Sequence, residues 1–217
     1  MSLNSVLEQL REFPVIPIVR TSTPELAATA IEWLSEAGLR TFEITMTIPG
    51  AIDLITQYSS REDILIGAGT VTSEDQANLC LDAGAKYLVS PIVVTELIEI
   101  SHQRGALCFL GALTPTEIHK AIEANADAVK IFPVKQMGGV EYLKALVPIF
   151  PGVPLVPTGG VKSDEIALYL ESGATFVGIG SELVNETMIR EGQREKIIKL
   201  GQQVLHQASA ISFTESR

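Results

Sequence analysis

The sequence has few of the residues that build disulfide frameworks and metal centres. Its two cysteines, Cys80 and Cys108, lie 28 positions apart and form no CxxC motif. Its three histidines, His102, His119 and His206, show neither the HxH nor the HExxH spacing of a zinc site. These absences exclude a disulfide-rich scaffold and argue against a protein-built metal centre. We therefore expect a protein of the reducing cytoplasm that uses neither a metal nor another cofactor.

Basic residues are also scarce. Lysine and arginine together number 16 against 26 aspartate and glutamate residues, which gives a net charge of −10. This charge repels the phosphate backbone of nucleic acids, and no run of lysine and arginine counteracts it. The first residues lack the basic and apolar segments of a signal peptide, and no apolar run approaches the length of about 20 residues that spans a bilayer. We expect neither nucleic acid nor a membrane as a partner.

The chain does contain a regular alternation of short apolar segments with amphipathic ones. Apolar residues make up 46% of the sequence, which is enough for one sizeable core. The apolar segments predict eight strands, at 14–20, 40–45, 64–69, 86–90, 107–111, 127–132, 154–158 and 175–179. Amphipathic segments predict helices between them, and residues 2–12 predict an additional helix before the first strand.

Local signals mark where these helices begin and end. Thr23 followed by Pro24 predicts a helix start, and capping boxes are predicted at Ser73 with Gln76 and at Thr114 with Glu117. Glycines at the C-terminal ends predict helix stops: Gly38, Gly84 and Gly173.

Eight strand–helix units in series predict an α/β fold, namely a closed (β/α)8 TIM barrel with an additional N-terminal helix. An open, doubly wound sheet is the alternative. Such a sheet would carry a glycine-rich loop after its first strand, where residues 18–22 contain no glycine. No linker divides the chain, so a single domain over 1–217 is predicted.

A weak internal repeat brings two charged residues together. Four helices end at Gly38, Gly84, Asn125 and Gly173, and the residues five positions later are Glu43, Val89, Lys130 and Gly178. Alternate strands of a (β/α)8 barrel supply the four side chains of one interior layer. We therefore expect Glu43 and Lys130 to lie at the same height on opposite walls and to point inward.

Both residues interrupt strands that are otherwise fit for burial. An ammonium group in a buried strand is costly, but burial favours the neutral amine that attacks carbonyl groups and forms Schiff bases. The other interpretation places Lys130 at a strand end, with its ammonium group reaching water. Glu43 is either a structural partner of that lysine or a catalytic acid and base, and we favour the second because a buried pair stabilises a fold poorly.

Two glycine-rich turns follow the seventh and eighth predicted strands, at 157–161 and 178–182. The corresponding loops of (β/α)8 enzymes commonly hold a phosphate group, because glycines let backbone N–H groups approach an anion. The candidate binding residues in these turns are Thr158, Gly159, Gly160, Gly180 and Ser181.

Three further candidates lie at strand ends. Thr70 offers a hydroxyl group after the third strand, and Pro91 follows the fourth. Arg20 ends the first strand, where its guanidinium group either binds a carboxylate or phosphate in a bidentate manner or simply lies at the surface.

These motifs resemble those of the bacterial 2-keto-3-deoxy-6-phosphogluconate (KDPG) and 4-hydroxy-2-oxoglutarate (KHG) aldolases. The resemblance runs from about residue 5 to residue 205 and is carried by FEIT (42–45), GAGTV (67–71), VSP (89–91), KIFP (130–133), PTGG (157–160) and GIGS (178–181). It implies a homotrimeric class I aldolase of (β/α)8 fold, with Lys130 as the Schiff-base lysine and Glu43 as the acid and base. It also implies that the substrate lies among Thr70, Pro91, Thr158, Gly159, Gly160 and Ser181.

One position departs from the pattern of well-known members, which carry an arginine four residues after the glutamate to help hold the substrate. Thr47 stands there in this chain, and Arg20 matches an arginine that other members keep at the end of the first strand. We expect this difference to affect the choice of substrate.

The resemblance implies cleavage of KDPG to pyruvate and glyceraldehyde 3-phosphate, with KHG, which yields pyruvate and glyoxylate, as a second substrate. The ligands are then a small phosphorylated keto acid and pyruvate. The alternatives are a 2-keto-3-deoxy-6-phosphogalactonate (KDPGal) aldolase, an isomerase or other lyase that uses Glu43 as its base, and a non-catalytic barrel that binds a phosphorylated ligand.

Overall fold

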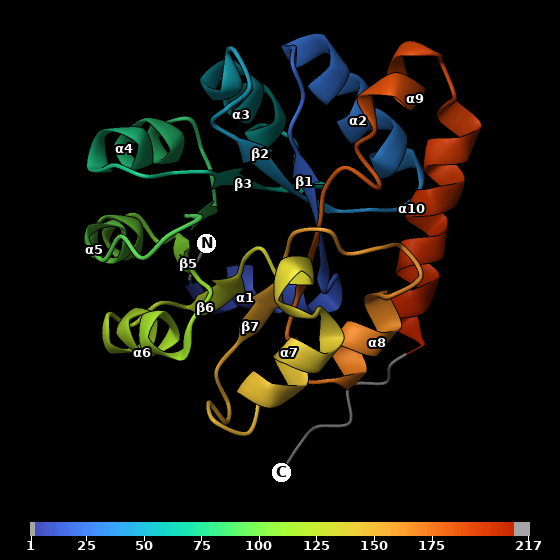
Figure 1. Ribbon diagram of the computed structural model, residues 1–217. Coiled ribbons are helices and arrows are strands. Elements are labelled where there is room, and N and C mark those ends of the chain that lie inside the picture. The colour runs from blue at the N-terminus through green and yellow to red at the C-terminus, as the bar shows by residue number, and fades with distance from the viewer. Residues whose placement is uncertain (1–2, 211–217) are drawn as a thin grey trace.

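The computed structural model describes residues 3–210, in which eight strands alternate with helices around a barrel (Figure 1). The strands are β1 (Val15–Val19), β2 (Thr41–Thr45), β3 (Leu65–Gly69), β4 (Tyr87–Val89), β5 (Leu107–Ala112), β6 (Ala128–Ile131), β7 (Leu155–Pro157) and β8 (Val177–Ile179). The helices are α1 (Leu3–Glu12), α2 (Pro24–Glu36), α3 (Ala51–Ser59), α4 (Glu74–Asp82), α5 (Glu96–Gln103), α6 (Pro115–Glu123), α7 (Val140–Leu146), α8 (Ile166–Glu171), α9 (Glu186–Arg190) and α10 (Arg194–Ser209). All eight predicted strands and the additional N-terminal helix are confirmed.

The strands form one parallel sheet in the order β7-β6-β5-β4-β3-β2-β1-β8. The two ends of this order meet where Thr158, just after β7, forms a parallel bridge with Gly178 of β8. The backbone N–H of Thr175 also donates to the carbonyl of Leu155 at 2.9 Å. The sheet is therefore a nearly closed barrel, and the predicted (β/α)8 fold is confirmed.

The interior of the barrel is apolar at one end. Tyr87, Phe109 and Phe176 stack inside it, with ring centroids 5.7 and 6.0 Å apart. Val6 and Leu10 of α1 belong to the same buried cluster, so α1 packs against the interior side chains. A separate and larger cluster lies between the strands and the outer helices. Because this end is filled, charged groups and a ligand must be sought at the carboxyl ends of the strands.

The predicted helix boundaries are largely confirmed. Thr114 and Glu117 form a complete capping box. The capping box predicted at Ser73 is wrong in its second half: Ser73 Oγ accepts from the backbone N–H of Gln76, but the Gln76 side chain accepts from the backbone N–H of Thr72. Gln76 therefore caps the residue before the expected one.

The three predicted helix stops also hold, since Gly38, Gly84 and Gly173 have φ angles of 108°, 100° and 100°. This left-handed conformation suits glycine because it has no Cβ atom.

Candidate active site

Lys130 and Glu43 meet inside the barrel. Lys130 Nζ donates to Glu43 Oε1 across 3.3 Å, from β6 and β2 respectively. Both side chains are buried, with only 4% and 3% of the residue surfaces exposed. The predicted placement of these two residues is confirmed. Taking two charges out of water is costly, so a buried pair of this kind is an inefficient way to stabilise a fold and is typical of a functional site.

A glycine on the neighbouring strand makes room for the carboxylate. A Cβ atom added to Gly69 would lie 2.0 Å from Glu43 Oε1, so no larger residue fits there without displacing Glu43. The Phe132 ring centroid lies 5.6 Å from Lys130 Nζ, a distance that allows a cation–π contact. The Lys130 amine thus lies near both a carboxylate and an aromatic ring.

A cavity of about 220 Å³ opens beside Lys130 at the carboxyl ends of β1, β6, β7 and β8. Six of the predicted binding residues line it together with Lys130: Arg20, Thr158, Gly159, Gly160, Gly180 and Ser181. Phe132, Lys162 and Glu182 also line it, and the sequence did not indicate them as site residues. The only available signal for the last two was their position, since Lys162 follows Gly160 by two residues and Glu182 directly follows Ser181.

The two glycine turns present unused backbone donors to this cavity. Among residues 3–210, no acceptor is hydrogen-bonded to the backbone N–H of Gly159, Gly160, Gly180 or Ser181. Gly159 and Gly160 have φ angles of 95° and 80°, which larger residues rarely adopt. Four free N–H groups on two adjacent turns form an arrangement suited to a phosphate group.

Arg20 lies at the edge of the same cavity. Its Nη2 donates to Thr70 Oγ1 at 3.2 Å, and no carboxylate in the described part of the chain lies within 4.0 Å of its guanidinium group. Thr70 has a φ angle of 62°, which is unusual for a β-branched residue and typical of strained functional positions. Thr70 therefore contacts a residue that lines the cavity, although Thr70 does not line the cavity itself.

The loop after Arg20 is fixed to the segment that follows the neighbouring strand, β8. Both the backbone N–H and the hydroxyl group of Ser22 donate to the Glu186 carboxylate at 2.7 Å. These hydrogen bonds hold the pKa of Glu186 below its ordinary value, so Glu186 remains an acceptor over a wide pH range. Glu186 lies at the start of α9, which follows β8, and it therefore fixes the loop that carries Arg20.

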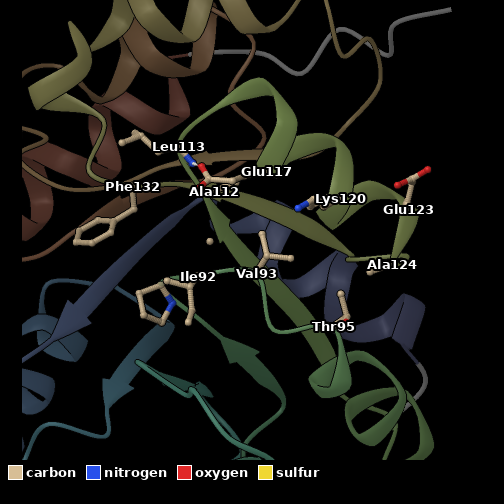
Figure 2. A pocket seen from close by; sticks show the side chains of 12 residues that line it. Ile92, Val93, Thr95, Ala112, Leu113, Glu117, Lys120, Glu123, Ala124 and Phe132 are labelled. Carbon is tan, nitrogen blue, oxygen red and sulfur yellow. Dashed lines mark hydrogen bonds between the residues drawn. The ribbon is translucent and has the colours of Figure 1, made fainter.

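Two further predicted binding residues do not line the cavity. Thr47 is exposed, and its hydroxyl group is 2.9 Å from that of Thr45. Pro91 lines a larger hollow of about 830 Å³ between the β4–α5 loop and α6. Figure 2 shows this hollow, with Phe132 at one end and Lys120 and Glu123 near the other. Phe132 lines both spaces.

Residues 3–210 give little support to a metal centre, a membrane-spanning helix or a reactive cysteine. No group of three or more histidine, cysteine, aspartate and glutamate side chains is arranged to hold a metal ion there, and no helix in that range could cross a bilayer. Cys80 and Cys108 are free and buried, and burial raises the pKa of each thiol to about 12. Neither thiol is therefore an effective nucleophile at neutral pH.

Comparison with known families decides the assignment. The model of the KDPG and KHG aldolase family matches residues 6–200. The chain belongs to this family. It is 31% identical to the 2-dehydro-3-deoxy-phosphogluconate aldolase of Treponema pallidum over 202 residues, which cover 93% of this chain and 96% of that protein. It is also 32% identical to the 2-dehydro-3-deoxy-6-phosphogalactonate aldolase of Escherichia coli K12, over 79% of this chain and 85% of that one.

Solved structures of this aldolase family share the fold. The KDPG aldolase of Legionella pneumophila, described with pyruvate captured as a covalent carbinolamine intermediate, superposes with a TM-score of 0.81 at 29% identity. The match covers 94% of this chain and 98% of that one. The predicted family is confirmed, and the chain is an aldolase of the KDPG/KHG type. The gluconate-type and galactonate-type relatives match at nearly the same identity, 31% and 32%, so identity alone does not select the substrate.

Proposed function

We propose that the protein is a class I aldolase that cleaves KDPG to pyruvate and glyceraldehyde 3-phosphate. The observation that carries the proposal is the placement of Lys130. Its amine lies against the Glu43 carboxylate at 3.3 Å and also lines a cavity bounded by two glycine turns. A nucleophile, a proton acceptor and an anion site are thus within reach of one small molecule, which is what this reaction requires.

The chemistry begins with proton transfer from the Lys130 ammonium group to Glu43, which leaves a neutral amine. The amine attacks the C2 ketone of the substrate, and Glu43 returns the proton to the hydroxyl group of the resulting carbinolamine, which leaves as water and gives a protonated imine. This imine accepts the electron pair of the C3–C4 bond as that bond breaks. Glu43, directly or through a water molecule, takes the proton of the C4 hydroxyl group, and glyceraldehyde 3-phosphate leaves. Protonation of the remaining enamine and hydrolysis of the imine then release pyruvate and regenerate Lys130.

The phosphate group of the substrate is assigned to the two glycine turns. Their four free backbone N–H groups supply donors that need no rearrangement, and Thr158 and Ser181 add hydroxyl groups. Arg20 is assigned to the substrate's anionic end because it lines the cavity and has no carboxylate partner within ion-pair distance in residues 3–210. Thr70 is assigned to the substrate through its hydrogen bond with Arg20, and Pro91 is assigned to it because Phe132 lines both the cavity and the hollow of Pro91.

A cleavage assay with KDPG, KDPGal and KHG tests the assignment. KHG has no phosphate group, so we expect its kcat/KM to be at least about 10-fold lower than that of KDPG, since a charged hydrogen-bonded group contributes roughly 1.5–3 kcal/mol. Preference for KDPGal would instead identify a galactonate-type enzyme. This is the alternative because the chain is also similar to the galactonate-type aldolase of Escherichia coli. Absence of turnover with all three would favour a barrel that only binds a phosphorylated ligand.

The resemblance also supports a cytoplasmic homotrimer that needs no cofactor. Light scattering of the purified protein is then expected to give three times the chain mass of 23.3 kDa. Cleavage activity is expected to survive EDTA, because the imine supplies the electron sink that a Lewis acid would otherwise provide.

Replacing Arg20 is expected to weaken substrate binding without affecting imine formation. A bidentate contact from arginine to carboxylate or phosphate is worth roughly 1.5–3 kcal/mol, so Arg20→Ala should raise KM about 10- to 150-fold. Borohydride trapping with saturating pyruvate should stay intact. The matched control is Arg104→Ala, since Arg104 is an exposed arginine paired with Asp82 away from the cavity. A wild-type KM for every phosphorylated substrate would show that Arg20 is a surface residue only.

A further inference from the structure

An ion pair at the edge of the cavity joins the two glycine turns. Lys162, two residues after Gly160, donates from Nζ to Glu182 Oε2 at 2.7 Å, and Glu182 directly follows Ser181. The other carboxylate oxygen, Oε1, accepts from Ser163 Oγ at 3.2 Å. Both oxygens of Glu182 are therefore engaged by the loop that follows β7.

The charge of Glu182 has the wrong sign for the ligand proposed here. Burial alone would raise the pKa of this carboxyl, but the hydrogen bond and charge of Lys162 outweigh that effect and keep it below its ordinary value. A carboxylate with a low pKa is negatively charged at neutral pH and repels a phosphate dianion nearby. It lines the same cavity as Gly159, Gly160, Gly180 and Ser181.

The other cations of the cavity do not cancel this charge. Lys130 is paired with Glu43, and Arg20 donates to the uncharged hydroxyl group of Thr70. In residues 3–210, Lys162 is the one basic side chain within 4.0 Å of the Glu182 carboxylate. Neutralisation of Glu182 thus depends on Lys162.

We propose that Lys162 and Glu182 act as a coupled pair that sets the affinity of the cavity for phosphate. Lys162 neutralises the carboxylate next to the glycine turns, and Glu182 in turn engages the ammonium group that would otherwise be free to bind the anion. The pair is then a specificity-determining element for substrates that end in phosphate. This inference rests on the proposed phosphate site in the glycine turns, and it extends that site to two side chains outside the motifs.

The coupling predicts opposite effects for the two single variants. Lys162→Ala leaves an uncompensated negative charge in the cavity, so we expect binding of inorganic phosphate to weaken about 10-fold or more. Glu182→Gln removes that charge and frees the ammonium group, so binding should tighten about 3-fold or more. The double variant should return to within about 3-fold of the wild-type protein, because neither charge remains.

Isothermal calorimetry with inorganic phosphate measures these constants without requiring turnover. Lys144→Ala is the matched control, because Lys144 forms an ion pair of the same kind with Glu141 on α7 outside the cavity, at 2.8 Å. Melting curves verify that each variant is folded. Borohydride trapping of pyruvate on Lys130 serves as a parallel readout and should be the same in all variants, because pyruvate carries no phosphate group.

The outcomes separate this inference from the proposed function. Equal phosphate affinity in all four proteins, or no measurable binding to any of them, overturns the role of the pair even where pyruvate is trapped on Lys130. A double variant as weak as Lys162→Ala also overturns it, since Lys162 would then act without Glu182. The predicted pattern without trapping of pyruvate would support the pair and contradict the aldolase mechanism.

Discussion

Incubation with pyruvate and borohydride is expected to attach one pyruvate-derived group to the peptide that contains Lys130. The Lys130 amine lies beside a carboxylate that can take up its proton, and it lines the cavity in which a keto acid would bind. Borohydride reduces the imine to a stable secondary amine, so mass spectrometry of a digest locates the reacting residue. Lys135 and Lys162 are the informative competitors, because the first packs against Gly160 and the second lines the cavity.

Lys130→Ala is expected to abolish both the labelling and the cleavage activity, with a loss of about 10⁴ or more in kcat, because no other group can form the imine. The substitution also leaves Glu43 buried without its cation, so we expect the free energy of unfolding to fall by about 3–5 kcal/mol. A melting curve distinguishes loss of the nucleophile from loss of the fold, and Lys130→Met with Glu43→Gln is the variant that leaves neither charge. Labelling of another lysine in the wild-type protein would contradict the assignment.

The main features of this site could be predicted because they depend on periodic structure. Strand residues alternate between the two faces of a sheet, and equal spacing from the helix ends sets their height in the barrel. These two regularities suffice to place Lys130 and Glu43 opposite each other, 87 positions apart in the chain. The glycine turns are predictable for a similar reason, since the loops after the seventh and eighth strands have a fixed place at the barrel rim.

The features that could not be predicted depend on loops and side-chain directions. Beyond the last strand residue no periodicity exists, so nothing in the sequence indicated that Lys162 and Glu182 form a pair or that the Thr47 hydroxyl group contacts that of Thr45. The left-handed backbone of Thr70 is a further example, because β-branched residues rarely adopt that conformation.

Replacing Glu43 distinguishes a role in proton transfer from a role in balancing the charge of Lys130. Glu43→Gln keeps nearly the same shape and can still accept a hydrogen bond, but it cannot take up a proton at the imine. Cleavage should therefore slow by about 10² or more, and so should exchange of the methyl protons of pyruvate, since both steps need a proton shuttle. Exchange is followed by NMR in deuterated water, and cleavage by release of pyruvate.

A purely structural role for Glu43 predicts a different result. If the carboxylate only balanced the charge of Lys130, its loss would favour the neutral amine, and imine formation would stay as fast or become faster while exchange and cleavage remained normal. Glu141→Gln, on the exposed pair with Lys144, is the control for removal of one carboxylate elsewhere. Borohydride trapping on Lys130 that still reaches completion at saturating pyruvate, combined with slow exchange and slow cleavage, would then identify Glu43 as the group that moves the protons, because the nucleophile would be working without its acid and base.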